Sequence, residues 1–575
     1  MMGQIQQSLF SDTSISKTII PQLVYRRKIV FKPYYQDQQF LLPKNINDFI
    51  APGHIARLIS SIIDQMDVQY IIDTYKGGGT SSYDPKMLLK SWILGFVNRI
   101  YSCRLVAKAL RENLAFIWIS GNQTPDFRTL NNFRLRLKDD IKKIFKEIVL
   151  YALEKDIIEG KDVFVDHTKN EANANKHKIV WSKQVERQTK MIDVELDRLF
   201  RYIDEINENE DTSFGNADLP EMERTGFDDE KVQEIIDKIN SRVKEKEITR
   251  DQGRDDRKKI RRVKELLKRK RLYSEKKKIL GERKSYSKTD TDAVAMMMKD
   301  KLTIRPAYNE GICVENGFVL NYVISDSAAD NVSFIPLMNG VIDNLNKTPD
   351  NTNADGAYGN EENHSYLERK EIGNFLKYNT FHKEKSISWR EKRIKFEDFI
   401  YNENEDAFIC KNGVTLHFNR QQTEITATGY ARKIDIYTPL KGSCKRCPFH
   451  AKCTKSNNRS LQVSWNAERL KQQARENLNS EKGVELRKRR GNEIESVFGD
   501  KKLNNRKRRY HLRGTIKVNL EAGLYYISHN MRKIHKTVTT KEPTEKHFQT
   551  QSEQKPHDTN YCNFLHFNHL AKNTF

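Results

Sequence analysis

The 575-residue chain lacks any long apolar run. A helix that crosses a membrane needs roughly 18 consecutive apolar residues, and the best candidate, Trp92 to Val97, falls far short of that length. The first residues, Met1 to Gln7, contain no charged segment followed by an apolar one, so we expect no secretion signal. These absences predict a cytoplasmic protein that has no membrane partner.

Cysteine is scarce, with seven in the chain. An odd number in a long chain without a signal favours reduced thiols or a metal site over a disulfide scaffold. Cys444 and Cys447 have the spacing of a metal-binding knuckle, and Cys453 with the distant Cys410 would complete four ligands for one structural Zn²⁺. His450 is an alternative ligand, and free thiols in a small insertion are the alternative interpretation.

Positive charge, by contrast, is abundant. Lys and Arg number 101 against 78 Asp and Glu, which gives a formal net charge of +23 and a pI near 9.4. Such a chain favours an anionic polymer as its partner, although an anionic membrane surface could also attract it.

Residues 45–150 are predicted to be helical, because apolar residues such as Ile55, Leu58, Ile59 and Ile62 recur at helical spacing. Basic residues form one face of this region, which is typical of a DNA-binding domain of the helix-turn-helix type. The candidate DNA contacts are Arg104, Lys108, Arg111, Arg128 and Arg134. An all-α bundle with a charged exterior is the alternative.

Three further segments differ in composition from their surroundings. Residues 183–284 are highly charged and helical in pattern, and residues 241–280 contain 18 Lys and Arg against 7 Asp and Glu. We expect an inserted antiparallel helical hairpin there, with disorder or an extended coil as alternatives. Residues 1–44 are interpreted as a loose arm, residues 381–480 as a Cys-containing insertion, and residues 537–575 as a disordered tail.

The remaining segments predict a mixed α/β core, built from residues 160–182, 285–380 and 481–536. A short strand ends on Asp166, and two strands joined by Asn316 and Gly317 form a hairpin. A helix, a strand ending near Asp355, a second helix, another strand and a late helix follow. The order is strand, hairpin, helix, strand, helix, strand, helix.

Three acidic residues, taken in chain order, suggest an enzyme that catalyses metal-assisted phosphoryl transfer. Asp166 and Asp355 are expected at strand ends and Glu495 on a late helix that is crowded by Lys and Arg. Carboxylates that converge in this way can hold two divalent cations, and the lack of His and Cys ligands favours Mg²⁺ (or Mn²⁺) over Zn²⁺. Lys502 lies seven residues after Glu495, on the same helical face, whereas Glu493 should point elsewhere. Ordinary salt bridges on a solvated basic helix are the alternative for this segment.

Six separated motifs, in this order, resemble the bacterial insertion-sequence transposases of the DDE type. They are Tyr83-Asp-Pro-Lys-Met-Leu-Leu-Lys90, Pro125-Asp-Phe-Arg-Thr-Leu-Asn-Asn-Phe-Arg134, Phe164-Val-Asp-His-Thr-Lys169 with Glu171-Ala-Asn-Ala-Asn175, Ser285-Tyr-Ser-Lys-Thr-Asp290, Ala354-Asp-Gly-Ala-Tyr-Gly-Asn-Glu-Glu-Asn363 and Ile494-Glu-Ser-Val-Phe-Gly499. The resemblance implies a ribonuclease-H-like catalytic core, with the catalytic acids at Asp166, Asp355 and Glu495, and an N-terminal helical domain that binds transposon ends.

The resemblance also implies partners and an activity. Such an enzyme cuts the terminal repeats of its element and joins the freed 3′-hydroxyl to target DNA, with Lys502 and Arg490 as candidate phosphate contacts. Relatives often carry Tyr and Arg at the positions that Lys488 and Gly491 occupy here, with Arg490 one residue away. Joining two ends requires at least a homodimer on DNA, acting at the nucleoid. A DNA-binding remnant and a plain nuclease are the alternatives.

Overall fold

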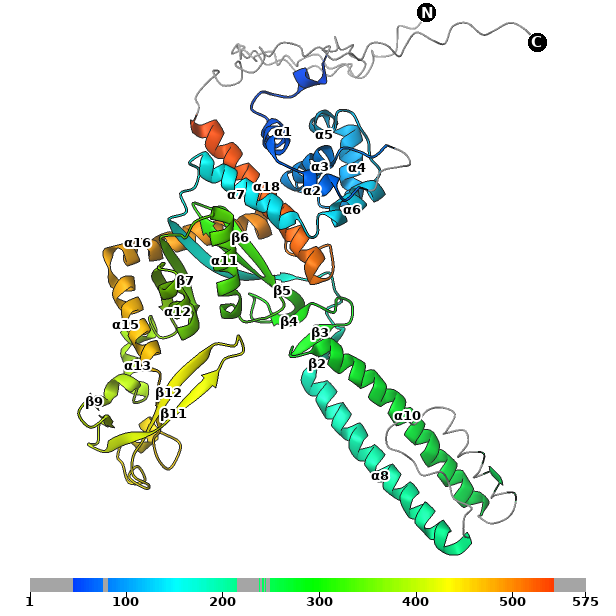
Figure 1. Cartoon of the computed structure of the whole chain (residues 1–575), viewed down its shortest axis with the longest axis vertical. Coiled ribbons are helices and arrows are strands. Elements are labelled where there is room, and N and C mark those ends of the chain that lie inside the picture. The colour runs from blue at the N-terminus through cyan, green and yellow to red at the C-terminus, as the bar shows by residue number, and fades with distance from the viewer. Residues whose placement is uncertain are drawn as a thin grey trace, which may run out of the picture. The chain divides into compact units, whose positions relative to one another are not determined.

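The computed structural model describes residues 45–75, 81–214 and 249–541, together with residues 237, 240, 241 and 244. The predicted N-terminal arm lies outside these residues. The chain divides into two units, residues 1–49 and residues 50–575. In the first unit the short helix Ile46–Phe49 is described, and the elements below belong to the second (Figure 1). None of the helices in the described ranges is long and apolar enough to cross a membrane.

The first part of the second unit is helical. Its helices are α1 (Ile55–Gln65), α2 (Gln69–Ile72), α3 (Pro85–Val97), α4 (Cys103–Glu112), α5 (Leu114–Ile119), α6 (Phe127–Arg136) and α7 (Ile141–Glu154). Helix α3 begins where the Asp84 side chain accepts the N–H of Met87 and Pro85 takes the first turn. Trp92 is fully buried, and its ring N–H donates to the carbonyl of Leu130 at 3.0 Å. This contact ties α3 to α6.

A mixed sheet follows. Its strands are β1 (Asp162–Glu171), β4 (Val294–Met297), β5 (Ile304–Glu315), β6 (Phe318–Ser325), β7 (Asn351–Gly359) and β8 (Gly373–Tyr378). The order is β4–β5–β1–β7–β8, and β6 also pairs with β5. Strand β1 is antiparallel to β5 and parallel to β7, and β7 is parallel to β8. The predicted Asn-Gly hairpin is confirmed, because Asn316 and Gly317 have φ of 54° and 71° between β5 and β6.

Helix α18 (Thr515–Lys541) connects the helical region to the sheet, since it packs against α3, α7 and β6. Its length corrects the predicted start of the tail at residue 537. The helix continues to Lys541, and in its last turns the hydroxyl groups of Thr537, Thr539 and Thr540 donate to backbone carbonyls one turn back. The rest of the predicted tail, residues 542–575, lies outside the described residues.

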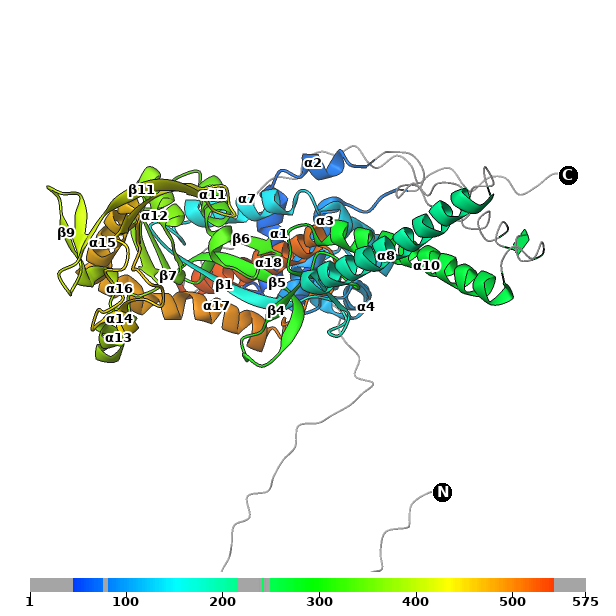
Figure 2. The ribbon, with the colours of Figure 1, turned by 90° about the horizontal axis from the view of Figure 1, so that it is seen from below.

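Two long helices form the charged insertion. Helix α8 (Ser182–Phe214) leaves the short strand β2 (Ile179–Trp181), and α10 (Arg250–Leu280) returns to β3 (Ser285–Ser287), which pairs with β2. The two helices run side by side (Figure 2). Arg262 of α10 donates to both carboxylate oxygens of Glu195, at 2.7 and 3.2 Å, and buried apolar residues such as Leu196 and Val263 lie on the two helices. The described part of this segment therefore forms the predicted helical hairpin.

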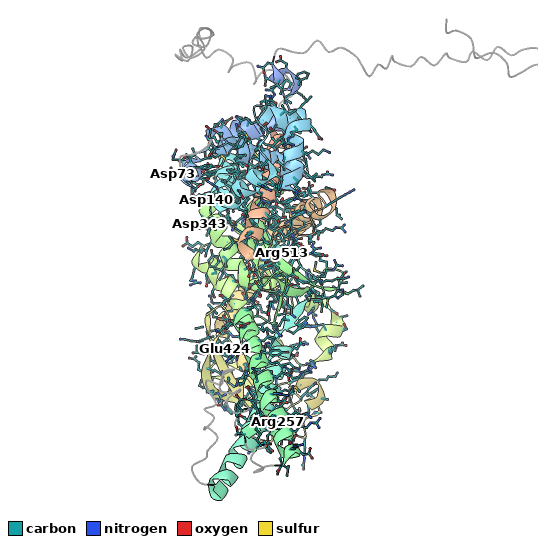
Figure 3. All side chains as sticks on the ribbon, turned by 90° about the vertical axis from the view of Figure 1, so that its right-hand side faces the viewer. Asp73, Asp140, Arg257, Asp343, Glu424 and Arg513 are labelled. Atoms are coloured by element: carbon teal, nitrogen blue, oxygen red, sulfur yellow. The ribbon has the colours of Figure 1, made fainter. Side chains whose placement is uncertain are left out.

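The Cys-containing insertion forms a second sheet, of order β13–β12–β11–β10–β9. Its strands are β9 (Ile400–Asn402), β10 (Ala407–Ile409), β11 (Thr415–Ile425), β12 (Ala431–Thr438) and β13 (Leu461–Val463), and it also contains the short helices α13 (Ile387–Lys392) and α14 (His450–Cys453). Glu424 of β11, labelled in Figure 3, pairs with Arg432 of β12.

The predicted end of this insertion at residue 480 is wrong. Helix α15 (Trp465–Asn479) packs against β8 and α12 (Glu361–Arg369) of the core. It does so because Leu470, Ala474 and Leu478 repeat every four residues and form one buried face.

Candidate active site

Asp166 and Asp355 occupy matching positions on two neighbouring parallel strands. The last pair in the register of β1 and β7 is Val165 with Ala354, and each aspartate is the next residue of its strand. The prediction that both aspartates end their strands is corrected. Strand β1 runs on to Glu171 because its antiparallel pairing with β5 continues, and β7 runs on to Gly359 after its pairing with β8 is interrupted. The parallel pairing between β1 and β7, by contrast, ends immediately before the two aspartates.

A guanidinium group bridges the two carboxylates. Arg490 is the last residue of α16 (Glu481–Arg490), and its Nη2 lies 3.2 Å from Asp166 Oδ2 and 4.0 Å from Asp355 Oδ2. Burial raises the pKa of Asp166 to about 6; the negative charge of Asp355 adds to this rise, and Arg490 opposes it. The carboxylates of Asp166 and Asp355 therefore share the positive charge of the Arg490 guanidinium.

Glu495 is not part of this cluster. It is exposed at the end of a π-helical turn, Gly491–Glu495 (η5), where the sequence predicted a regular α-helix. Within the described ranges, no three His, Cys, Asp or Glu side chains stand close enough to hold a metal ion. The structure brings the two aspartates together with Arg490, and the expected convergence of Glu495 with them stays a prediction. A π-turn repeats about every five residues, so Glu495 lies about one turn beyond Arg490.

The neighbouring acid, Glu493, has a structural role. Its Oε2 accepts the N–H of Gly317 at 2.7 Å, and its Oε1 lies 3.5 Å from Arg489. These contacts hold the π-turn against the hairpin between β5 and β6. Glu493 thus faces away from the two aspartates.

Lys502 reaches β1 from a second π-turn, Asp500–Asn504 (η6). Its ammonium group donates to the hydroxyl of Thr168 and, at 2.9 Å, to the carbonyl of Lys169. Thr168 is two residues after Asp166, so both side chains leave the same face of β1. Burial lowers the pKa of Lys502 to about 8. Lys502 is therefore held against β1 at Thr168, two residues along the strand from Asp166.

On the opposite face of β1, sequence reasoning missed His167. Its Nδ1 lies 2.5 Å from the hydroxyl oxygen of Tyr358 on β7, and its buried Nε2 has no hydrogen-bond partner in the described structure. Burial lowers the pKa of His167 to about 4, so the ring is neutral near pH 7. The ring fits because Gly311 lies opposite it, where a Cβ would approach His167 Nε2 to 2.3 Å. The motifs that contain His167 and Tyr358 were visible in the sequence, but their pairing was not.

Two family models match the chain. One, described as a transposase DDE domain, covers residues 409–535, and the other, described as a transposase domain (DUF772), covers residues 44–136. These two matches support a DDE transposase. Neither the curated proteins nor the solved structures contain a significant match to it. The first matched segment includes Arg490, Glu495 and Lys502, and DNA is the polymer on which a transposase acts.

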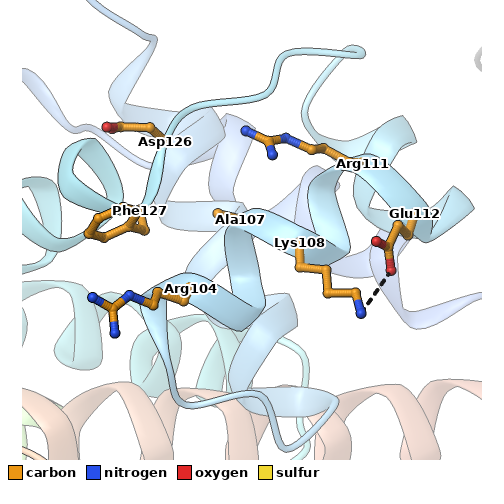
Figure 4. A pocket seen from close by; sticks show the side chains of 7 residues that line it. All are labelled: Arg104, Ala107, Lys108, Arg111, Glu112, Asp126 and Phe127. Atoms are coloured by element: carbon orange, nitrogen blue, oxygen red, sulfur yellow. Dashed lines mark ion pairs between the residues drawn. The ribbon is translucent and has the colours of Figure 1, made fainter.

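The helical region of the transposase, which the second model covers, carries a basic hollow (Figure 4). A pocket of about 360 Å³ is lined by three basic residues, two acidic residues, an alanine and an aromatic ring: Arg104, Lys108, Arg111, Glu112, Asp126, Ala107 and Phe127. The Arg104 guanidinium lies 5.0 Å from the centre of the Phe127 ring, and Lys108 lies 3.6 Å from Glu112. The guanidinium of the exposed Arg128 lies 5.7 Å from the centre of the same ring. Two of these cations, Arg104 and Arg128, therefore lie against one aromatic side chain.

Arg134 does not belong to this surface, which corrects its prediction as a DNA contact. It is 5% exposed, its guanidinium lies 4.7 Å from the Trp92 ring centre, and its Nη2 donates to Asn131 Oδ1 at 2.7 Å. It is buried because it shares the inner face of α6 with Leu130. In the transposase, Arg134 therefore stabilises the helical region.

Proposed function

We propose that this transposase binds the terminal repeats of its insertion sequence, cuts DNA there and joins the freed 3′-hydroxyl to target DNA by metal-dependent phosphoryl transfer. The observation that carries the proposal is the pair Asp166 and Asp355, whose carboxylates already share the positive charge of Arg490. An oxygen-only pair of ligands suits a hard divalent cation, so Mg²⁺ or Mn²⁺ is the proposed cofactor.

The sheet supports a ribonuclease-H-like core. Its strands follow the order β6–β5–β1–β7–β8, with the first three antiparallel and the last three parallel. Asp166 and Asp355 lie on its two central strands. In this proposal the core consists of the sheet with α11 (Phe334–Leu345), α12, α15 and α16, and the helical region before it binds DNA ends.

Each side chain has a distinct role in the proposed reaction. Asp166 has a pKa of about 6 and is mainly ionised at neutral pH, so it can bind a cation there. A bound Mg²⁺ or Mn²⁺ would lower the pKa of the attacking water or 3′-hydroxyl and stabilise the leaving oxygen. Lys502 has a pKa of about 8 and is mainly charged at neutral pH, so it can hold a phosphate beside β1.

Glu495 is the proposed third acid. It follows Arg490 by one π-turn, and together with Asp166 and Asp355 it would hold the cation if this turn lay closer to the aspartates in the DNA complex. Arg490, if it no longer paired with the two aspartates, would be able to contact a phosphate of the bound strand.

End binding is assigned to the basic hollow. Arg104, Lys108 and Arg111 line the hollow, and Arg128 lies near the Phe127 ring beside it. Such exposed cations suit DNA phosphates. Because two transposon ends must be joined to one target, we propose a homodimer in the DNA complex.

The first test is nicking of a labelled duplex that carries the terminal repeats, with Mg²⁺ and with EDTA. We expect metal-dependent nicks at the element's end. Asp355→Asn and Glu495→Gln should each reduce the rate by about a thousandfold, because loss of a metal ligand removes several kcal/mol of charge stabilisation, while DNA binding persists. Asp343→Asn, an exposed aspartate on α11 (Figure 3), is the matched control.

The other outcomes separate the alternatives. Specific binding without nicking would identify a DNA-binding remnant, and nicks at random positions would identify a plain nuclease. Full activity of Asp355→Asn would show that the acid assignment is wrong.

A further inference from the structure

Four cysteines in the insertion line one small cavity. Cys410, Cys444, Cys447 and Cys453 all face a space of about 20 Å³ behind β10 and β11, together with His450. All four are free thiols, and they come from three separate stretches of the chain. The cavity has room for about one water-sized sphere. The lining includes no Asp or Glu, so any ion held there would be bound by sulfur.

The sulfur atoms are already oriented by hydrogen bonds from the backbone. The N–H of Val414 donates to Cys410 Sγ at 3.3 Å, and the N–H of Arg459 donates to Cys444 Sγ at 3.4 Å. Arg459 also lines the cavity, and its Nη1 donates to the carbonyl of Cys453 at 3.2 Å. These contacts fix the direction in which two of the sulfur atoms point, as hydrogen bonds to metal ligands commonly do.

The Cys-containing insertion has only a small apolar core. The apolar cluster next to the cysteines contains six buried residues, in a region of five strands and several loops. These residues are Phe399, Phe408, Leu416, Tyr437, Leu461 and Val463. Small units with cores of this size are usually stabilised by disulfides or by a structural metal, and the cysteines here are unpaired.

From this arrangement we infer that Cys410, Cys444, Cys447 and Cys453 bind one structural Zn²⁺. Four thiolates make a closed tetrahedral site, and soft sulfur ligands select zinc over Mg²⁺. The side chains are not yet at coordinating distances, so binding would draw them together and close the cavity. His450 is the alternative ligand, because its Nε2 donates to the carbonyl of Ser456 at 3.1 Å and leaves Nδ1 able to bind a metal. The four cysteines are preferred because they complete a tetrahedral set without it.

The site would also give a fixed shape to a basic loop. Residues 441–459 contain six Lys and Arg and no Asp or Glu. Five of these cations, those other than Arg459, are exposed. A metal that joins the loop to β10 and the turn after it would hold these charges in place beside the sheet.

The test is the metal content of the full-length protein, purified without chelator under reducing conditions. Elemental analysis should find one zinc per chain, and a mercurial thiol reagent should release it, as detected by a chromogenic chelator. Replacement of zinc by Co²⁺ should produce the thiolate-to-cobalt charge-transfer band and the visible bands of a tetrahedral site. Wild-type protein that holds no zinc, even after reconstitution, would overturn the inference without any variant having to fold.

Variants locate the site. Cys447→Ser should lose the zinc and the cobalt charge-transfer band, whereas Cys103→Ser, a cysteine of α4 outside the insertion, should keep both. Asp355→Asn should also retain zinc, because its carboxylate belongs to the proposed catalytic site. Zinc that is lost in Asp355→Asn but kept in Cys447→Ser would place the metal at the aspartates instead. The zinc inference and the proposed activity can therefore fail separately.

Discussion

The guanidinium of Arg490 lies 3.2 Å from the carboxylate of Asp166. The contact joins the C-terminal end of α16 to the middle of β1, two segments more than 300 residues apart in the chain. The Arg490 side chain is 16% exposed, so most of its charge is offset by Asp166 and Asp355 and little by water. Any cation that binds these aspartates competes with Arg490 for the same oxygens.

Arg490→Gln should therefore strengthen divalent-cation binding. Removal of the competing positive charge leaves two facing carboxylates, and we expect the Mn²⁺ affinity to rise by about tenfold, which corresponds to ~1.4 kcal/mol. Calorimetric titration of Mn²⁺ into the full chain measures the effect. Arg487→Gln is the matched control, because Arg487 is on the same helix and bonds to the carbonyl of Gly483. Equal affinity in the variant and the wild type would show that Arg490 does not compete.

Arg104 and Arg134 should respond differently to substitution by alanine. Arg104→Ala should weaken binding to terminal-repeat DNA and reduce the slope of log affinity against log salt by ~0.9, as expected for one lost phosphate contact. Arg134→Ala should instead lower the melting temperature, because it removes a buried guanidinium from the Trp92 ring. Fluorescence anisotropy at several salt concentrations measures the DNA affinity of both variants, and thermal unfolding measures their melting temperatures. An unchanged salt slope for Arg104→Ala would remove Arg104 from the DNA-binding surface.

Gly311→Ala should destabilise the core. The added methyl group would meet the His167 ring at 2.3 Å, and overpacking of this kind costs ~1–3 kcal/mol. His167→Ala in the same chain should recover part of that loss, because it removes the clashing ring. Urea unfolding of the two single variants and the double variant measures the coupling. Gly53→Ala is the control, since an added Cβ there meets nothing within 4 Å.

Glu521 should make stability depend on acid pH. Burial by itself raises its pKa, but Lys507 and His511 outweigh burial and hold the pKa of Glu521 at about 2, below its usual 4.5. A carboxylate with a depressed pKa stabilises the fold fully above 4.5, and this contribution is lost as the pH falls from 4.5 through about 2. Urea unfolding from about pH 5 to about pH 3 should show a steeper loss in the wild type than in Glu521→Gln. If the free energy of unfolding fell equally with pH in the wild type and in Glu521→Gln, the prediction would be contradicted.

Much of this protein follows from local sequence patterns. The spacing of Ile55, Leu58 and Ile59 predicts α1, and Asn316-Gly317 predicts the hairpin between β5 and β6. Such signals work because helical and strand periodicity and turn chemistry depend on residues close together in the chain. The six transposase-like motifs could likewise be recognised because each is a short continuous segment. The family matches support the transposase that these motifs indicated.

Other features depend on contacts between distant residues. Helical spacing places Arg134 on the same face of α6 as Leu130, but only the folded chain shows that Trp92 lies against its side chain and that Arg128 stays exposed. The π-turns that place Arg490 on Asp166 and leave Glu495 exposed depend on how the helix packs against β1 and β5. Sequence identified the charged groups of the site, and only the packing of the folded chain decided which of them meet, because burial and pairing are set across hundreds of residues.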